Sequence, residues 1–282
     1  MKVLITGGNG QLGKTFEVTW NNKANVLALS KKSLDVTAFE SVSKNIQVHK
    51  PDVVIHCAAY TAVDACEKNK TIALDTNTLG TFYVAKACAE NKALLIYIST
   101  DYVFDGNKEA PYEVTDKTNP LSIYGLSKSL GERLVQKTCS KSYIVRTSWL
   151  YGYDGKNFVK TISNKAKHNE QCTVILDQVG SPTFANDLSN AIFHLIGKPF
   201  GIYHFSNQGS CSWYEFAKEI YLQIGSDPNL VSAITTEEYG AIAQRPAYSV
   251  LSLTKYTSST GQLLRHWKEA LSAFFERGKM DD

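Results

Sequence analysis

A glycine-rich turn between a short apolar strand and a helix is the feature that most constrains the fold of this chain. Residues 2–6 are typical of a strand, Gly7, Gly10 and Gly13 follow, and residues 11–20 are typical of a helix. Glycine permits the tight turn, lets backbone approach a pyrophosphate, and lets the helix pack closely on the strand. The free amides at the start of the helix favour an anion at the same place. A glycine triplet alone is a weak sign and also fits a turn without ligand, but within a strand–turn–helix unit it indicates a dinucleotide site.

Strands and helices alternate through the first half of the chain. Further strands are expected at residues 25–30, 52–58, 93–99 and 142–147, and further helices at residues 38–49, 71–91 and 122–137. This alternation is typical of right-handed βαβ units around a parallel sheet. The sequence therefore predicts an α/β protein with a Rossmann-like, doubly wound parallel sheet.

The regularity weakens after Thr147, which indicates a smaller C-terminal substrate-binding lobe. Helices are expected at residues 156–169, 185–196, 213–224 and 262–277, and strands at residues 173–176 and 201–205. We expect residues 1–150 to form the dinucleotide-binding domain, with its last strands contributed from residues 151–205, and residues 151–282 to form mainly the interleaved lobe. Ligands of such sheets bind at the carboxyl ends of the strands, where a cleft between the lobes would lie.

Composition excludes several classes of function. The chain has 282 residues, 43% of them hydrophobic and 20% charged, and a net charge of +3. That charge is too small to indicate a nucleic-acid or membrane surface, and neither a signal peptide nor a long apolar span is evident. The six cysteines lack metal-ligand spacing and fit reduced thiols of a cytoplasmic protein.

The end of the second expected strand bears on the choice of cofactor. An acid at this position usually binds the adenosine ribose of NAD(H), but here Ser30, Lys31 and Lys32 follow the strand and the first acid is Asp35. A hydroxyl and two lysines suit a 2′-phosphate better, so NADP(H) is favoured and NADH stays possible. The alternative is that both lysines only face solvent.

Tyr124 and Lys128 form the candidate catalytic pair. They are four residues apart on an expected helix and therefore share one of its faces. An ammonium near a phenol favours the phenolate, so we expect Lys128 to lower the pKa of Tyr124 from its usual value of about 10. Tyr124 would then give a proton to a carbonyl oxygen, and Thr100, at the end of a strand, would donate a second hydrogen bond to that oxygen.

The glycine turn, the Ser99–Thr100 pair and the Tyr-x-x-x-Lys motif together resemble the short-chain dehydrogenase/reductase superfamily. Longer strings narrow the resemblance to the dTDP-4-dehydrorhamnose reductases, in which NADPH or NADH reduces the 4-keto group of dTDP-4-keto-L-rhamnose. The strings lie at residues 58–64, 99–106, 146–152, 155–158, 177–183 and 245–246, and the similarity extends over almost the whole chain.

The resemblance implies roles for individual residues. Cofactor contacts are implied for Gly10, Gln11, Leu12, Asp35, Val36, Ala58, Ala59, Tyr60, Tyr124 and Lys128, and sugar contacts for Thr100, Asp101, Tyr124 and Trp149. We further expect Asn157, Gln178 and Thr183 to supply polar groups to the cleft, and Arg245 to bind the diphosphate through its planar fork. The alternatives are a core aromatic for Trp149, turn or cap residues for the three polar ones, and a surface ion pair for Arg245.

Two departures from the family pattern affect these expectations. Thr15 stands where some relatives place a glutamate that binds Mg²⁺ at a dimer contact, so we expect no metal. Residues 247–250 read Ala-Tyr-Ser-Val, where relatives often carry Asn and a second basic residue. The sequence therefore does not indicate which residues of this segment bind the nucleotide. The chain is expected to act as a monomer or a homodimer.

Two other functions stay open. A sugar-nucleotide dehydratase or epimerase shares the scaffold, but dehydration needs a second carboxylate after the threonine, and Tyr102 follows Asp101 here. A regulatory subunit that binds a dinucleotide without catalysis is the other possibility, although Thr100, Tyr124 and Lys128 are all present.

Overall fold

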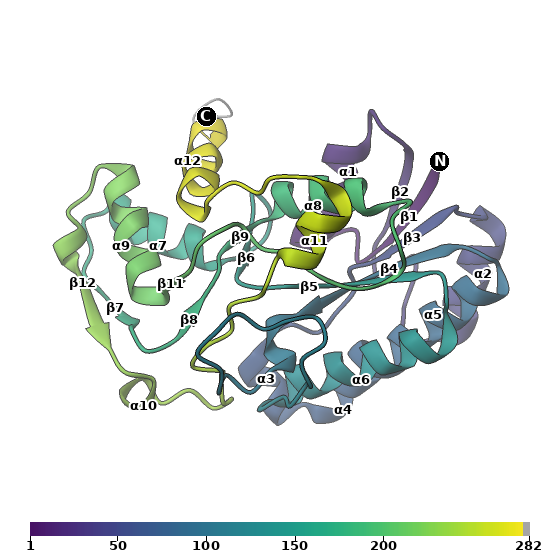
Figure 1. The fold of residues 1–282 in the computed structure, drawn as a ribbon, viewed down its shortest axis with the longest axis horizontal. Coiled ribbons are helices and arrows are strands. Elements are labelled where there is room, and N and C mark those ends of the chain that lie inside the picture. Colours follow the sequence, from purple (N-terminus) through teal and green to yellow (C-terminus); the bar gives the residue numbers. More distant parts are fainter. Residues whose placement is uncertain (279–282) are drawn as a thin grey trace.

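The computed structural model describes residues 1–278, which fold around a six-stranded parallel sheet (Figure 1). The strand order is β2-β1-β3-β4-β5-β10, and every pairing is parallel. The strands are β1 (Lys2–Thr6), β2 (Asn25–Leu29), β3 (Val53–His56), β4 (Leu94–Thr100), β5 (Ser142–Thr147) and β10 (Gly201–His204). The order reverses beside β1, where the chain places β2 on one side and β3 on the other. The predicted doubly wound sheet is confirmed, and the ligand crevice of such a sheet lies at this reversal.

Helices cover both faces of the sheet because both faces of its strands are apolar. Val3 and Ile5 of β1 enter one buried cluster and Leu4 enters the other, as the alternation of side chains along a strand requires. On one face lie α1 (Gln11–Trp20), α8 (Ala185–Leu195) and α11 (Thr254–Thr260), and on the other lie α2 (Phe39–His49), α5 (Gly80–Glu90) and α6 (Ile123–Thr138) (Figure 1).

A third apolar cluster lies beside the sheet, on the left of Figure 1. It is built by α7 (Phe158–Lys167), α9 (Trp213–Ile224), α12 (Trp267–Gly278) and the parallel pair of β7 (Cys172–Ile175) with β12 (Val231–Ile234). Short pairs join it to the sheet: β6 (Leu150–Tyr151) with β9 (Thr183–Phe184), and β8 (Val179–Gly180) with β11 (Cys211–Ser212). The short α10 (Thr236–Tyr239) follows β12.

The helix predicted over residues 71–91 is interrupted. The structure has α4 (Lys70–Leu74), a π-helical turn at Asp75–Leu79 and then α5, preceded by α3 (Val63–Lys68), which the sequence pattern did not reveal. Asn77 lies in the π turn, and its side chain bonds both the backbone N–H and the carbonyl of Tyr60 and the hydroxyl of Ser127. The wide turn therefore fixes the segment after β3 against α6, and such turns often occur near functional sites.

The predicted C-terminal helix over residues 262–277 begins later. Gly261, with φ +70°, ends α11, and α12 starts only at Trp267. The segment between them is held by Arg265, whose guanidinium makes two hydrogen bonds of 2.8 and 2.7 Å to the Asp187 carboxylate. This tertiary ion pair is made between residues 78 positions apart, so helical periodicity did not indicate it.

Two further expectations concern thiols and membranes. All six cysteines are free thiols in the structure, which agrees with the expected reduced state. Within residues 1–278, no helix is both long enough and apolar enough to cross a bilayer.

Gly13 allows the close packing of α1 on the glycine turn, and we predict that Gly13→Ala weakens the fold. A methyl group there would collide with the carbonyl oxygen of Gly7 and lie 2.8 Å from the Cα of Gly8. We expect the free energy of unfolding to fall by about 1–3 kcal/mol in denaturant titrations, the usual cost of overpacking. Val18→Ala, on the exposed side of the same helix, is the control and should change stability by less than about 0.5 kcal/mol. Equal losses in both variants would contradict the packing argument.

Candidate active site

A cavity of about 490 Å³ lies at the carboxyl ends of β1, β3, β4 and β5. Eleven of the residues proposed from the sequence line it: Gly7, Gly10, Gln11, Leu12, Gly13, Ala59, Thr100, Asp101, Tyr124, Lys128 and Trp149. The sequence analysis missed other lining residues, among them Thr61, Val63, Ser148, Lys156 and Trp213. Most of them lie inside the motif strings quoted above, where nothing singled out their side chains, whereas Trp213 lies outside every quoted string.

The glycine turn has the geometry that a dinucleotide pyrophosphate requires. Gly7 adopts φ +70°. A Cβ atom added to Gly7 would lie only 2.8 Å from the backbone Cα and N of Ala58, so only glycine fits there. Gly10 lines the cavity, and an added Cβ there would meet only the Gly7 carbonyl oxygen, at 3.2 Å. Gly10 is also the N-cap of α1 and makes no side-chain cap, so the amides of the first turn are free to bind an anion. The residues present therefore fit a nicotinamide dinucleotide.

Tyr124 is a half-buried phenol that lines the cavity. It stands at the start of α6, where Ser122 caps the helix by accepting the Gly125 N–H at 3.2 Å. Burial raises the pKa of Tyr124 well above its usual value, while a hydrogen bond with Thr100 acts in the opposite direction. The expectation that Lys128 lowers this pKa is not met, because burial raises the pKa and the neighbouring Asp101 and Tyr102 raise it further. Tyr124 is therefore protonated at neutral pH and able to donate.

Lys128 is buried and directs its ammonium group at the backbone. Its Nζ donates a 2.6 Å hydrogen bond to the carbonyl of Ile98 and lies 4.2 Å from the ring centroid of Tyr97. Burial lowers the pKa of Lys128 to about 7, while the negative charge of Glu132 raises it. The four-residue spacing places Tyr124 and Lys128 on one helix face, as predicted. The ammonium group of Lys128, however, is bound by a backbone carbonyl of β4.

Asp101 brings an incompletely paired carboxylate to the same cavity. Its Oδ1 accepts the Thr100 hydroxyl at 3.0 Å, whereas Oδ2 is buried without a hydrogen-bond partner. Burial raises the pKa of Asp101 to about 6. A buried acceptor without a partner is costly, so Oδ2 is available to accept a hydrogen bond from a ligand hydroxyl.

Trp149 forms an aromatic wall of the cavity. Its ring stacks on that of Trp213 with centroids 3.6 Å apart and an interplanar angle of 8°. The backbone of Trp149 is in the left-handed region, at φ +47°, and its ring fills the space that a side chain at position 180 would need. A bulky residue held in this conformation stores strain, which is common at ligand sites. Trp149 therefore lines the cleft and also packs against the third apolar cluster, so a sugar contact stays a prediction.

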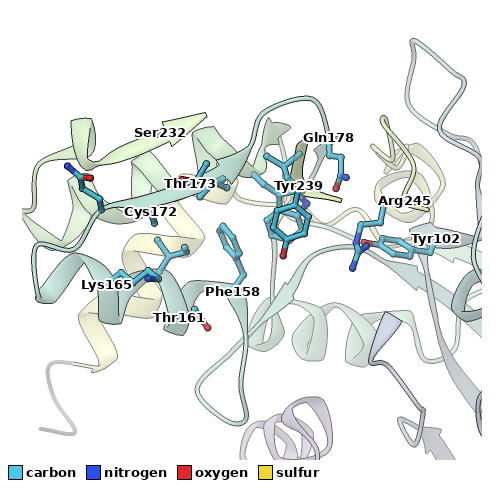
Figure 2. A pocket seen from close by; sticks show the side chains of 15 residues that line it. Tyr102, Phe158, Thr161, Lys165, Cys172, Thr173, Gln178, Ser232, Tyr239 and Arg245 are labelled. Carbon is cyan, nitrogen blue, oxygen red and sulfur yellow. The ribbon is translucent and has the colours of Figure 1, made fainter. Parts of the chain in front are cut away.

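A second cavity, of about 720 Å³, adjoins the first and shares Tyr102 and Trp213 with it. Figure 2 shows Gln178, Tyr239 and Arg245 among its walls, with Arg245 beside the ring of Tyr102. Arg245 also binds Asp64 through two hydrogen bonds of 3.1 and 2.8 Å. The arginine thus lines the cavity and forms an ion pair at the same time, and its proposed contact with a diphosphate stays a prediction.

Some proposed residues lie outside both cavities. Asn157 caps α7 and donates to the Gln11 side chain at 2.8 Å, and Thr183 is fully buried against Thr147. The expectation that these two supply free polar groups to the cleft is therefore corrected. The carboxylate of Asp35 accepts hydrogen bonds from the N–H and the hydroxyl of Thr37, and these bonds lower the pKa of Asp35. Also outside the cavity linings are Ser30, Lys31, Val36, Ala58 and Tyr60.

A Rossmann-like sheet, a pyrophosphate turn and a tyrosine–lysine pair define a nicotinamide-dependent oxidoreductase. The sequence matches the family described as RmlD substrate binding domain over residues 1–280. It is 39% identical over 284 residues to the dTDP-4-dehydrorhamnose reductase of Aggregatibacter actinomycetemcomitans, covering 96% of this chain and 97% of that one. It is also 44% identical over 278 residues to the spore coat polysaccharide biosynthesis protein SpsK of Bacillus subtilis, covering 98% of this chain and 97% of that one.

A solved structure agrees over the whole fold. The dTDP-4-dehydrorhamnose reductase of Bacillus anthracis, in complex with NADP, superimposes with a TM-score of 0.95 at 42% identity, covering 98% of this chain and 99% of that one. The chain belongs to the RmlD family, which includes the dTDP-4-dehydrorhamnose reductases, as the resemblance of its motifs indicated.

The buried Asp101 carboxylate should make stability depend on pH. Its pKa is raised to about 6 in the folded protein, so folding favours the protonated form, and stability falls as pH rises from about 4 through 6. We expect Asp101→Asn to raise the free energy of unfolding at pH 7 by roughly 1–3 kcal/mol, with the gain vanishing near pH 4. Urea titrations at both pH values measure this effect, and Asp52→Asn, at an exposed position, is the control. A gain independent of pH would contradict the burial argument.

Proposed function

We propose that this protein reduces the 4-keto group of dTDP-4-keto-L-rhamnose to give dTDP-L-rhamnose, with NADPH as cofactor. The observation that carries the proposal is the pair of adjoining cavities joined at Tyr102 and Trp213. One holds the glycine turn and the hydroxyls of Thr100 and Tyr124, and the other has the size and the arginine that a nucleotide diphosphate needs. In this division, residues 1–150 with strands from residues 151–205 bind the cofactor, and residues 151–282 bind mainly the sugar nucleotide.

The residues of the chain supply the acid and the orientation for this reduction. When bound, the cofactor supplies the hydride. Tyr124 gives its proton to the carbonyl oxygen, and its raised pKa keeps that proton available at neutral pH. Thr100 positions the same oxygen once its hydroxyl proton turns from Asp101 Oδ1 to the substrate, while Asp101 Oδ2 accepts from a neighbouring sugar hydroxyl. The Lys128 ammonium favours the tyrosinate that proton transfer leaves.

The further site assignments follow the same division. Gly7, Gly10, Gln11, Leu12, Gly13 and Ala59 form the proposed pyrophosphate side of the cleft. Trp149 faces the sugar, and Gln178 and Arg245 face the nucleotide. Ser30 and Lys31 follow β2, which pairs with β1, so they lie beyond the glycine turn where the adenosine ribose would extend.

The alternatives from the sequence receive no support from the site. A dehydratase needs a second carboxylate beside Asp101, but the next residue is Tyr102, a buried phenol whose pKa burial raises. A regulatory dinucleotide-binding subunit would not require the Thr100–Tyr124 contact. A reductase forms one NADP⁺ for each product molecule, whereas an epimerase retains its cofactor, so the measured ratio separates these activities.

We expect Tyr124→Phe to abolish reduction while leaving cofactor binding intact. The substitution removes the proton donor and little volume, so kcat should fall by roughly 10²- to 10⁴-fold. NADPH consumption with dTDP-4-keto-L-rhamnose gives the rate, and fluorescence titration gives the cofactor Kd, which should stay within twofold. Tyr83→Phe is the matched control, because Tyr83 lies on α5 and lines neither cavity. Normal turnover by the Tyr124 variant would refute this mechanism.

We propose NADPH over NADH on the basis of Lys31 and Lys32, which are exposed after β2. Removing both charges by Lys31→Ala/Lys32→Ala should raise the Kd for NADPH by about tenfold, because an exposed charge–phosphate contact contributes about 1 kcal/mol, and should leave the Kd for NADH unchanged. The pair Lys44→Ala/Lys50→Ala serves as the control for net charge. A higher turnover with NADH than with NADPH in the unaltered protein would refute the preference.

We also propose that the protein acts in the cytoplasm as a monomer or homodimer without a metal. Thr15, which replaces the expected acid, is buried and donates its hydroxyl to the Gln11 carbonyl at 2.9 Å. Light scattering with and without EDTA measures the oligomeric state and its dependence on metal.

A further inference from the structure

Below the catalytic pair, α6 carries a third polar residue on the same face. Tyr124, Lys128 and Glu132 follow one another at intervals of four residues, so they form one row along the helix. The first two line the cavity, whereas Glu132 is only 3% exposed and lines neither cavity. The proposed mechanism assigns no role to Glu132.

Glu132 joins α6 to two neighbouring strands of the sheet. Its Oε1 accepts the Ser99 hydroxyl at 2.5 Å and the Nε of Arg146 at 2.9 Å, and its Oε2 accepts Nη2 of Arg146 at 2.7 Å. Ser99 of β4 and Arg146 of β5 are direct partners in the parallel register, and Thr100 is paired with Thr147 one position further on. The carboxylate thus fixes the strand ends directly before the catalytic threonine.

The network continues through the sheet and surrounds Lys128. Nη1 of Arg146 lies 3.3 Å from Nε2 of His204 on β10. On β4, the hydroxyl of Tyr97 donates to the Lys128 carbonyl at 3.3 Å, and the carbonyl of Ile98 accepts Lys128 Nζ. Three successive residues of β4 therefore bind α6, and the last of these bonds is to Glu132.

Stability alone does not account for a buried ion pair here. Removing two charges from water costs several kcal/mol per ion, and well-packed apolar residues often replace such pairs without loss. The pair does provide a fixed geometry, because a bidentate carboxylate–guanidinium contact sets both distance and orientation. Glu132 lies one helical turn from Lys128, and its partner Ser99 directly precedes Thr100. The fixed geometry of the ion pair therefore acts on the two catalytic groups.

We propose that Glu132 is a positioning residue of the reductase, which fixes Lys128 and Thr100 relative to each other through Ser99 and Arg146. This inference rests on the proposed function, because it concerns the same catalytic groups.

The charge of Glu132 also acts on Lys128. The titratable groups that face Lys128 are Glu132 from α6, His56 from β3, Cys57 directly after β3, and Tyr97 from β4. Burial lowers the pKa of His56 to about 3 and raises those of Cys57 and Tyr97, so these three are neutral at pH 7. Among these groups, only Glu132 is charged. Its loss should lower the pKa of Lys128.

The test is Glu132→Gln, which keeps the shape of the side chain and removes its charge. The Lys128 resonance in protein labelled with ¹³C at lysine Cε, assigned with Lys128→Arg, reports the titration of this amine directly. We expect a lower midpoint in the variant, an alkaline limb of kcat/KM that moves to lower pH, and a kcat reduced by roughly 10- to 100-fold through misplacement. The KM for NADPH should change much less than kcat.

Two further variants keep the test decisive. Glu132→Asp retains the charge but has a shorter side chain. Its Lys128 titration midpoint should lie close to that of the unaltered protein, whereas its kcat should stay reduced. If Glu132→Gln does not fold because Arg146 is left unpaired, Glu132→Met/Arg146→Met removes both charges and should fold, again with a lowered Lys128 titration midpoint.

Asp187→Asn is the matched control, because it breaks another bidentate pair, with Arg265, away from the cleft. It should lower stability without moving the Lys128 midpoint.

An unchanged Lys128 midpoint together with a kcat within twofold of the unaltered protein, in a folded Glu132 variant, would overturn the inference. The NMR titration needs no substrate, so it is independent of the proposed function. If the unaltered protein reduced no sugar nucleotide, the proposed function would fail while the titration still reported on Glu132. Normal reduction with an unmoved titration would defeat the positioning role alone.

Discussion

The site depends on one constraint, the parallel direction of all six strands of the sheet. Parallel pairing brings the carboxyl ends of β1, β3, β4 and β5 to one edge, where each strand is followed by a segment that lines the cleft. The glycine turn follows β1, and Asp101 follows β4. Residues far apart in the sequence therefore face one cavity, and a single antiparallel strand in the middle of the sheet would carry its contribution to the opposite edge.

Burial decides the electrostatics of this cleft more than the pairing of charges does. The pKa of Tyr124 is raised and that of Lys128 lowered, because in both cases the neutral form is easier to bury. A neutral phenol suits the direction of reduction, in which the tyrosine must begin with its proton. Tyr124 therefore begins in the protonation state that the proposed reduction needs, and the lysine charge matters most after the proton has left.

Much of the fold could be predicted from local patterns, whereas contacts between distant residues could not. The strand at residues 2–6 and the helices at residues 11–20 and 213–224 were predicted to the residue, because apolar periodicity and end signals coincide there. The π turn was missed because it depends on Asn77 reaching Tyr60 and Ser127. The proposed catalytic trio of Thr100, Tyr124 and Lys128 came from motif spacing, and a cap role for Asn157 was one of the alternatives given from the sequence. The raised pKa of Tyr124 depends on burial, which spacing does not reveal.

The bond between Gln11 and Asn157 has a consequence for how such enzymes diversify. Asn157 caps α7, the first helix after the sheet region, and at the same time holds the side chain that begins α1. Lys14 and Asp154 add an ion pair of 3.1 Å beside it. A hybrid protein that joined the first 150 residues of one relative to the remainder of another would have to carry matching residues at these positions. Exchange of residues 151–282 alone would therefore break both contacts, whereas substitutions elsewhere in that part of the chain would leave them intact.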